Sequence, residues 1–508
     1  MNFSALDLAI FVGFYALVLG FSFVKSRGQK DSADYFLGGR RLPWWLIGVS
    51  VVAANLSTEQ FVGMAGQAAG NVGLAVSAWQ LTGALGIVVV AFVFLPRFLS
   101  AGIYTMPEYL EYRYNAVARG IMSILTVVTY ATVTTSAVLY SGGTALETIF
   151  GVDLRLSILV IAVLGVAYVL WGGLLAAVWA DLFQGTALLL GGLLTIGLAV
   201  AACGGPGEFM SKNADRLHMV LPADHPELPW TVLVSGMWIP IFYYCGLNQF
   251  ITQRALAAGS LKQGQLGVIF AGALWLLVPI AIVMPGIAAH QLYGTRLERM
   301  DQAYPMLVRE LVPNGARGFI LASLAGAVVS SLASMLNSAS TIFTMDLWKR
   351  YVNRGASEAS LVRVGRASTA VFLVIAFVVS LSDLLKGGVF KFIQEFQGYI
   401  SPGILAAFVF GFAVRRAPPS AGVAALVASA PIYGVLAYFM GHVAYLHRMT
   451  LTFAILMLLM ALITWVAPLK EPRVLPTRAN FDLSTSTSVK WAAAAVVFGV
   501  ALYFLVFT

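Results

Sequence analysis

Apolar segments of membrane-spanning length recur along almost the whole of this 508-residue chain, separated mostly by short polar connections. About 20 apolar residues suffice to cross the hydrocarbon core of a bilayer as a helix, which satisfies its own backbone hydrogen bonds. We therefore expect one all-α polytopic membrane domain of about 14 helices. The predicted spans are residues 4–24, 43–65, 72–98, 115–148, 154–171, 174–203, 231–252, 263–292, 316–347, 364–384, 388–414, 418–440, 446–467 and 489–507.

The charge distribution predicts the orientation of these spans. Only 10% of the residues are charged, against about a quarter in soluble domains. If both termini are external, 21 of the 31 Lys and Arg residues fall on the cytoplasmic side, as the positive-inside rule requires. Arg296, Arg299, Arg309 and Arg317 oppose the rule. We expect a plasma (inner) membrane protein that contacts the lipid bilayer, and the net charge of +9 gives no reason to expect a nucleic-acid partner.

A polar island interrupts the second predicted span. Asn55, Ser57, Thr58, Glu59 and Gln60 lie within the apolar run 43–65, and polar groups cannot face lipid without large cost. Asn, Ser and Thr also compete with the helix for backbone hydrogen bonds. The island predicts a broken helix that frees carbonyl groups for a cation, with a polar contact between packed helices as the alternative.

Two groups of five spans predict an inverted repeat. The polar connection 204–230 separates residues 43–203 from residues 231–414, and an odd number of spans makes the second group enter from the opposite side. Pro240 and Gly246 predict a break near the start of the second group as well. Residues 1–42 then form a first helix and a cytoplasmic loop, and residues 418–508 form C-terminal helices.

The ninth span carries adjacent hydroxyls at Ser330 and Ser331 among small residues. Small residues allow close helix packing, so a packing seam is one reading. The other is a cation site, in which the two hydroxyls join carbonyls freed by the broken helix, such as those of Ala53 and Leu56.

Carboxylates within spans are rare and mark functional sites by default. Asp181 is the favoured ion-path residue. Asp346 and Asp383 stand at span ends and are expected to be solvated, and Asp7 is expected near the membrane interface. The carboxylates inside spans are Glu59, Asp181 and Glu395.

Amides in the interrupted segments suit a neutral solute with hydroxyl groups, because an amide both donates and accepts hydrogen bonds. Gln60, Gln80 and Gln394 are the candidates. Aromatic faces could stack on a sugar ring; the candidates are Trp79, Tyr243, Tyr244, Trp275 and Phe396.

The chain resembles the sodium:solute symporter family, in particular its sodium/glucose cotransporter branch. The matching segments are Asp34 to Gly39, Ala53 to Phe61, Ile103 to Tyr109, Val178 to Asp181, Asn248 with Gln249, Gln253 with Arg254, Ser330 to Asp346, Ile393 to Glu395 and Ser401 to Gly403. The resemblance implies a LeuT-type fold with a five-plus-five inverted repeat, which agrees with the count of spans. It also implies a co-transported sodium ion and a small neutral solute, a sugar or polyol, taken up by alternating access.

The resemblance implies roles for particular residues. Sodium would be held by the carbonyls of Ala53, Leu56 and Ala327 and the hydroxyls of Ser330 and Ser331. Asp181 resembles the carboxylate on the sodium path, Tyr244 the inner gate beneath the sugar, and Asn55 its neighbour. Gln60 and Gln394 match sugar-binding positions.

Four pocket positions depart from the galactose-transporting members of the branch. Gln80 replaces Glu, Gly83 replaces Ser, Ile241 replaces Asn and Trp275 replaces Lys. Galactose is therefore not the expected solute. A non-sugar solute such as an amino acid or an organic anion, and a sensor that does not transport, remain alternatives. An enzyme is not expected, because His290, His442 and His447 lack the spacing of metal ligands. Neither the solute, the stoichiometry nor the oligomeric state follows from the sequence.

Overall fold

A computed structural model describes residues 4–26, 41–103, 105–169, 174–477 and 482–508. Within them, ten helices are long and apolar enough to cross a membrane, and two bent helix pairs raise that number to 12. Two shorter apolar helices, Leu154–Val163 and Trp238–Leu247, coincide with the remaining predicted spans. The predicted all-α architecture is confirmed, whereas length and composition do not confirm the count of 14. The matching segment at 34–39 and Tyr104 lie outside the described residues.

The polar island breaks a helix at the predicted place. Helix α3 (Trp44–Asn55) ends within the island, and a π-helical turn (Glu59–Met64) continues into α4 (Ala65–Ala69). The two halves are bent by 56°. A second bent pair, α21 (Val389–Gln397) and α22 (Ser401–Ala413), has an angle of 45°, and its second helix begins at Ser401, in a segment that matches the family.

The third break lies at Asn248 rather than at Pro240 or Gly246. Asn248 is extended between α14 (Trp238–Leu247) and α15 (Gln249–Leu256). Pro240 lies in the first turn of α14, where a backbone N–H has no helical acceptor in any case. A side chain at Gly246 would approach the ring of Phe94 to 2.6 Å, so this glycine allows close packing and does not end the helix.

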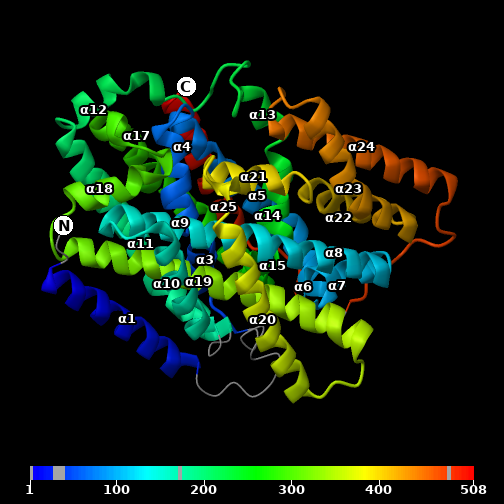
Figure 1. The fold of residues 1–508 in the computed structure, drawn as a ribbon. Helices are drawn as coiled ribbons and strands as arrows, with labels where there is room; N and C mark the ends of the chain where they lie inside the picture. Colours follow the sequence, from blue (N-terminus) through cyan, green and yellow to red (C-terminus); the bar gives the residue numbers. More distant parts are fainter. Residues whose placement is uncertain (1–3, 27–40, 104, 170–173, 478–481) are drawn as a thin grey trace.

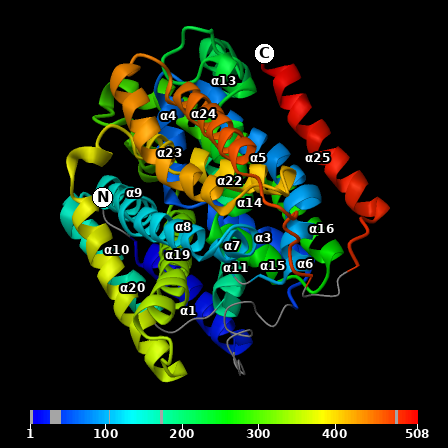
Figure 2. The same cartoon turned by 90° about the vertical axis from the view of Figure 1, so that its right-hand side faces the viewer.

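The broken helix α3 lies at the centre of the bundle (Figures 1 and 2). It packs against α11 (Leu174–Ala202), α16 (Leu261–Trp275) and α19 (Ala316–Ile342). Helix α1 (Ala5–Ser26) covers α11 and α19 from outside, together with α9 (Thr135–Phe150) and α10 (Leu154–Val169) on the same flank. The polar island is thereby surrounded by protein.

The other helices enclose this centre. Figure 2 shows α20 and α25 at opposite edges of the bundle, and α23 beside α24. The remaining helices not yet given are α5 (Ala78–Val89), α6 (Leu95–Ala101), α7 (Met106–Arg113), α8 (Ala116–Thr129), α12 (Pro206–Lys212), α13 (Trp230–Val234), α17 (Met284–Tyr293), α18 (Ala303–Leu311), α20 (Glu358–Ser380), α23 (Pro419–Phe439), α24 (Tyr445–Val466) and α25 (Thr487–Val506).

Asp346, which was expected to be solvated, and Asp7, which was expected near the membrane interface, are both buried. Asp346 is fully buried, and it accepts hydrogen bonds from Arg119 and, at 3.3 Å, from the Thr105 hydroxyl. Asp7 accepts hydrogen bonds at 2.7 and 2.9 Å from the backbone N–H groups of Gly315 and Gly318, at the start of α19. A carboxylate is stable there because it satisfies donors that the helix leaves unpaired. Asp383 is exposed, as predicted.

Candidate functional site

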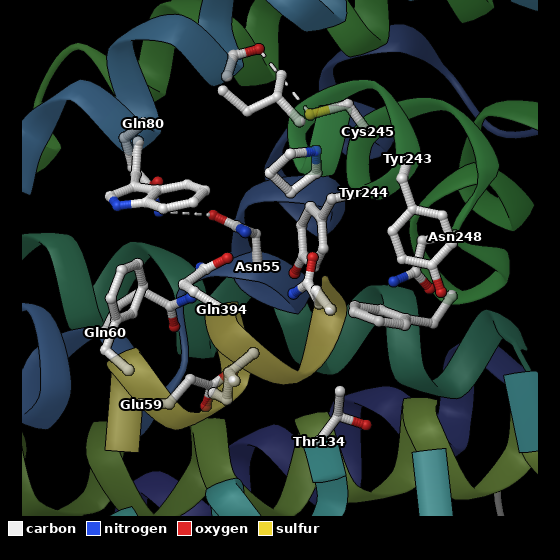
Figure 3. A pocket seen from close by; sticks show the side chains of 18 of the residues that line it. Asn55, Glu59, Gln60, Gln80, Thr134, Tyr243, Tyr244, Cys245, Asn248 and Gln394 are labelled. Carbon is white, nitrogen blue, oxygen red and sulfur yellow. Dashed lines mark hydrogen bonds between the residues drawn. The ribbon is translucent and has the colours of Figure 1, made fainter. Parts of the chain in front are cut away.

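A pocket lies between the broken helices, and all six predicted solute-binding residues line it (Figure 3). Gln60 comes from the π-helical turn after α3, Ile241 and Tyr244 come from α14, and the predicted gate residue Asn55 ends α3. The remaining three of the six come from three further helices: Gln80 from α5, Trp275 from α16 and Gln394 from α21. Residues up to 339 positions apart therefore meet in one pocket, to which each of the three broken helices contributes.

The pocket is contracted in this conformation. Its volume is about 70 Å³, less than half of the 150 Å³ or so of an engineered cavity that binds benzene. A sugar is larger than benzene, so the pocket must widen to admit one.

The polar side chains of the pocket are buried except that of Tyr244, which is partly buried, and some already have partners. The Gln80 amide donates to the Asn55 side-chain carbonyl oxygen at 3.2 Å, and Figure 3 shows Asn55 between Gln80 and Tyr244. The Gln60 side-chain oxygen accepts from the Ser57 backbone N–H at 3.0 Å. Both amides are held in place by these bonds, which leaves their other polar atoms for a solute.

Other polar atoms of the pocket have no partner within the described part of the chain. They are Nε1 of Trp275 and the side-chain oxygens of Gln394 and Gln397. A buried polar atom without a hydrogen bond costs about 1–3 kcal/mol. One donor and two acceptors on the same small cavity thus fit a solute that both donates and accepts, as hydroxyl groups do.

Gly83 and Trp275 pack as a matched pair. A Cβ at Gly83 would lie 3.5 Å from the Trp275 ring, so any larger side chain would meet the indole. Gly83 and Trp275 are two of the four positions that differ from the galactose-transporting members, and the small residue at one leaves room for the large ring at the other. Trp275 gives the pocket an apolar face with one N–H.

The backbone at the break in α3 frees the two predicted carbonyls. In an unbroken helix, the carbonyls of Ala53 and Leu56 would accept from the N–H groups of Ser57 and Gln60. Instead, the Ser57 N–H donates to the Gln60 side chain, and the Gln60 N–H donates to the Ser57 carbonyl at 3.1 Å. Both helical donors are diverted, which leaves two carbonyl oxygens suited to a hard cation.

The predicted hydroxyl ligands lie on α19, which packs against α3. Ser331 is fully buried, and its hydroxyl has no hydrogen-bond partner among the described residues. Ser330 donates to a carboxylate oxygen of Asp181 at 2.5 Å, and Ala327 lies one turn before Ser331. A sodium ion would supply the partner that the Ser331 oxygen lacks.

Asp181 is paired with Arg254 in a buried cluster between α11 and α15. The two side chains are 0% and 1% exposed, and the guanidinium donates to the carboxylate at 2.8 Å. Ser50 on α3 donates to the same carboxylate oxygen and accepts from Arg254, and Ser334 on α19 also accepts from Arg254 at 3.1 Å. The cluster joins four helices, and Asp181 connects it to Ser330, one of the candidate sodium ligands.

Sequence reasoning missed the role of Arg254, which appears there within a family-matching segment but without any function of its own. Its position two residues after the predicted span 231–252, in a segment with Asn248 and Gln249, was the available signal. Phe396, a candidate for stacking, does not line the pocket; its ring packs against Tyr399 at a centroid distance of 5.8 Å. Glu395 is partly exposed.

Asp301 contacts both α4 and α21, which belong to the two bent helix pairs. It lies outside the spans, accepts from the Val389 N–H at the start of α21 at 3.1 Å, and lies so close to Gly66 of α4 that a Cβ there would be 2.7 Å from its oxygen. Burial raises the pKa of Asp301 to about 6, although Val389 and the Arg299 guanidinium oppose the increase.

We expect acidification to stabilise the packing of α4 and α21 around Asp301. Because its pKa is higher in the folded state than in the unfolded state, its contribution is full below about pH 4 and is lost as the pH rises through about 6. Lowering the pH from 7.5 to 5.5 should raise the denaturation temperature of the natural protein more than that of Asp301→Asn. Equal pH responses of the two proteins would contradict this assignment.

The sequence matches a family description and curated relatives over most of its length. Residues 35–428 match the description "Sodium:solute symporter family". The chain is 39% identical to the sodium/glucose cotransporter of Vibrio parahaemolyticus, over 90% of each chain. It is 31% identical to sodium/glucose cotransporter 1 of Ovis aries, over 81% of this chain and 68% of that protein. It is also 31% identical to sodium/myo-inositol cotransporter 2 of Homo sapiens, over 81% of this chain and 66% of that protein.

The fold matches solved structures as well. A substrate-bound, outward-open Na⁺-coupled sialic acid symporter superposes with a TM-score of 0.81 at 22% identity, over 93% of this chain and all of that chain. A closed nucleobase-cation-symport-1 family transporter gives a TM-score of 0.56 at 11% identity. These similarities confirm the predicted LeuT-type fold.

Proposed function

The chain belongs to the sodium:solute symporter family, and on that premise we propose that it takes up a neutral sugar or polyol together with sodium by alternating access. Sodium is the co-transported ion, and the protein is a transporter and not an enzyme. Among its relatives, the two cotransporters named above for glucose and the one named for myo-inositol have neutral polyhydroxylated solutes in their names.

The unpartnered neutral polar atoms of the pocket carry the proposal of a sugar or polyol. Trp275, Gln394 and Gln397 offer one donor and two acceptors, and the described lining contains no Lys or Arg. A carboxylate-bearing solute would be buried there without a cation, which is strongly unfavourable. The same absence argues against an amino acid or an organic anion.

We propose that the sodium ion binds between α3 and α19. Its ligands are the carbonyls of Ala53, Leu56 and Ala327 and the hydroxyls of Ser330 and Ser331. The diverted helical donors at the break and the unpartnered Ser331 hydroxyl support this site. Asp181 then lies on the path of the ion to the cytoplasm, with Tyr244 and Asn55 as the inner gate.

We also propose how the chain is organised in the membrane. Residues 43–203 and 231–414 are the two inverted repeats, preceded by residues 1–42 and followed by the C-terminal helices of residues 418–508. Both termini are external in the plasma membrane. Accessibility of cysteines introduced at residues 3 and 508 to an impermeant thiol reagent in intact cells tests the orientation.

Uptake into proteoliposomes tests the function. With an inward sodium gradient, a panel of radiolabelled hexoses and inositols should identify a solute that accumulates, and an equal potassium gradient should abolish its accumulation. Gln60→Ala and Gln394→Ala should each weaken solute binding by about tenfold, since a lost hydrogen bond costs about 1–3 kcal/mol. Sodium binding without solute should change little in either variant.

Two outcomes would overturn the proposal. Solute binding without accumulation in well-sealed vesicles would favour a sensor. Sodium-driven uptake of amino acids or organic anions, with no response to any sugar or polyol, would retain the symporter and reject the solute class.

We predict that the departures at three pocket positions set the choice of sugar. The triple change Gln80→Glu, Ile241→Asn and Trp275→Lys should shift preference toward galactose by tenfold or more, because it introduces hydrogen-bonding groups for the sugar hydroxyls. Trp275→Lys alone should be inactive, since it buries a charge without its counterpart. Competition uptake against a panel of hexoses measures the shift, and an unchanged profile in a folded triple variant would mean that these side chains do not contact the solute.

A further inference from the structure

A second cavity, of about 240 Å³, lies on the flank of the molecule away from the solute pocket. Helices α1, α9, α10 and α19 enclose it, and Figure 1 shows these four helices on one side of the bundle. Among the described lining residues, only Thr58, at the break in α3, has a polar side chain. Transport as described above makes no use of this cavity.

The cavity opens toward the hydrocarbon of the membrane. Leu8 of α1, Phe150 of α9 and Val160 of α10 line it and are 53%, 40% and 43% exposed. All three belong to apolar helices identified as spans or short apolar segments. An apolar cavity does not hold water stably and accepts apolar guests, and in this setting the guest at hand is a lipid tail.

The inner end of the cavity requires no water. The Thr58 hydroxyl is hydrogen-bonded to Ser141 at 2.8 Å, so the one polar side chain of the described lining is already satisfied. Val328 and Val329 of α19 also line this cavity, directly before Ser330. A hydrocarbon chain can therefore reach the break in α3 without leaving a polar group unpaired.

Three arginine residues lie close in sequence or by contact to residues that line the cavity. Arg155 is exposed near the start of α10, and Arg317 lies one turn before the lining residue Leu321 of α19. Arg309 donates to the Thr148 carbonyl, between lining residues 146 and 150 of α9, at 3.3 Å. Four carboxylates lie near these arginines. Glu310 is 3.2 Å from Arg309, Asp153 caps the start of α10, Glu147 pairs with Arg299, and Asp7 accepts from the backbone N–H groups of Gly315 and Gly318.

Among the described residues Arg155 is exposed and forms no ion pair, so its guanidinium is available to a phosphate. Arg309 and Arg317 are also two of the residues that oppose the positive-inside rule, so loop orientation does not account for them. Arginine is well suited to bind phosphate, because its planar group offers paired N–H donors.

We propose that this flank binds a phospholipid, with one acyl chain in the cavity and the phosphate at the rim near Arg155 and Arg309. The chain fills the space between α1, α10 and the break in α3. The lipid thereby supports the bent conformation of the helix that carries both the solute and the sodium candidates. Binding of the lipid requires neither sodium nor solute, so this site stands or falls separately from the proposed transport function.

Photo-labelling tests the acyl-chain site. The full-length protein is reconstituted in nanodiscs with a phospholipid that carries a diazirine in one acyl chain, and labelled peptides are mapped by mass spectrometry. We expect label in peptides covering residues 142–161 and 321–329. Ala325→Phe, which places a ring in the cavity, should reduce this label at least fivefold, and Ala145→Leu should act in the same direction from the opposite wall.

Ala494→Phe is the matched control, because Ala494 is exposed on α25 at another face. It should leave the label unchanged. A monodisperse peak in gel filtration shows that a variant is folded. The test requires only one of the two cavity variants to be folded. Absence of label from these peptides, or label unaffected by a folded cavity variant, would overturn the proposal.

The headgroup assignment has its own test. Arg155→Gln should reduce labelling by the phospholipid at least twofold, while labelling by a diazirine-bearing fatty alcohol, which lacks phosphate, should not change. Equal labelling of the natural protein and Arg155→Gln by the phospholipid would overturn the placement of the phosphate.

Discussion

Ser331→Ala should raise the sodium concentration for half-maximal uptake by about tenfold to a hundredfold and leave a folded protein. The Ser331 hydroxyl is buried without a partner among the described residues, so its loss breaks no internal hydrogen bond. A hydrogen bond or comparable polar contact to a charged group contributes about 1.5–3 kcal/mol, which corresponds to the stated range. Sodium titration of solute uptake in proteoliposomes measures the effect.

Ser323→Ala is the matched control for this prediction. Ser323 is also buried on α19, but its hydroxyl bonds to the backbone carbonyls of Phe319 and Ile320, away from the break in α3. Its replacement should leave sodium affinity unchanged. An unchanged half-saturation in Ser331→Ala would remove this residue from the sodium site.

Arg254→Met should destabilise the protein by about 3–5 kcal/mol, because it leaves the buried Asp181 carboxylate without its counter-charge. Ser50 and Ser334 would lose hydrogen bonds as well. The expected result is a large loss of purified, monodisperse protein and a lower denaturation temperature for what remains. Thermal unfolding in detergent, at fixed sodium concentration, provides the measurement.

The double change Arg254→Met with Asp181→Leu separates charge from packing. Replacing both members of a buried pair by apolar residues is often neutral or stabilising, so the double variant should recover most of the stability lost in Arg254→Met. It should still fail in sodium-driven uptake if Asp181 lies on the ion path. A single variant as stable as the natural protein would show that the guanidinium does not neutralise Asp181.

The conformation of the solute pocket is a property of the whole bundle. Its six predicted residues come from five parts of the chain and meet only when helices distant in sequence pack together. Their meeting followed from the family resemblance, whereas their roles in binding await the experiments above. The contraction of the pocket to about 70 Å³ depends on how Trp275 and its neighbours pack, which no local pattern encodes.

The sequence by itself determined the spans and the first helix break. Hydropathy over about 20 residues is enough for a span, because a lipid-facing helix satisfies its own backbone. Asn55, Ser57 and Gln60 were enough for the break, since they divert backbone hydrogen bonds within four residues of themselves. The break predicted at Pro240 and Gly246 was wrong in detail, because a proline is tolerated in the first turn of a helix. The break lies at Asn248 instead, and it has no comparable local cause.

Only the tertiary structure decided which charges are paired. Arg254 and Arg119 read as loop cations, and Asp346 reads as a solvated end, because sequence reports polarity without reporting the partner. Arg254 is 73 residues from Asp181, and Arg119 is 227 residues from Asp346. A buried charge is tolerable only beside its counter-charge, and the folding of distant helices against one another is what brings the two together.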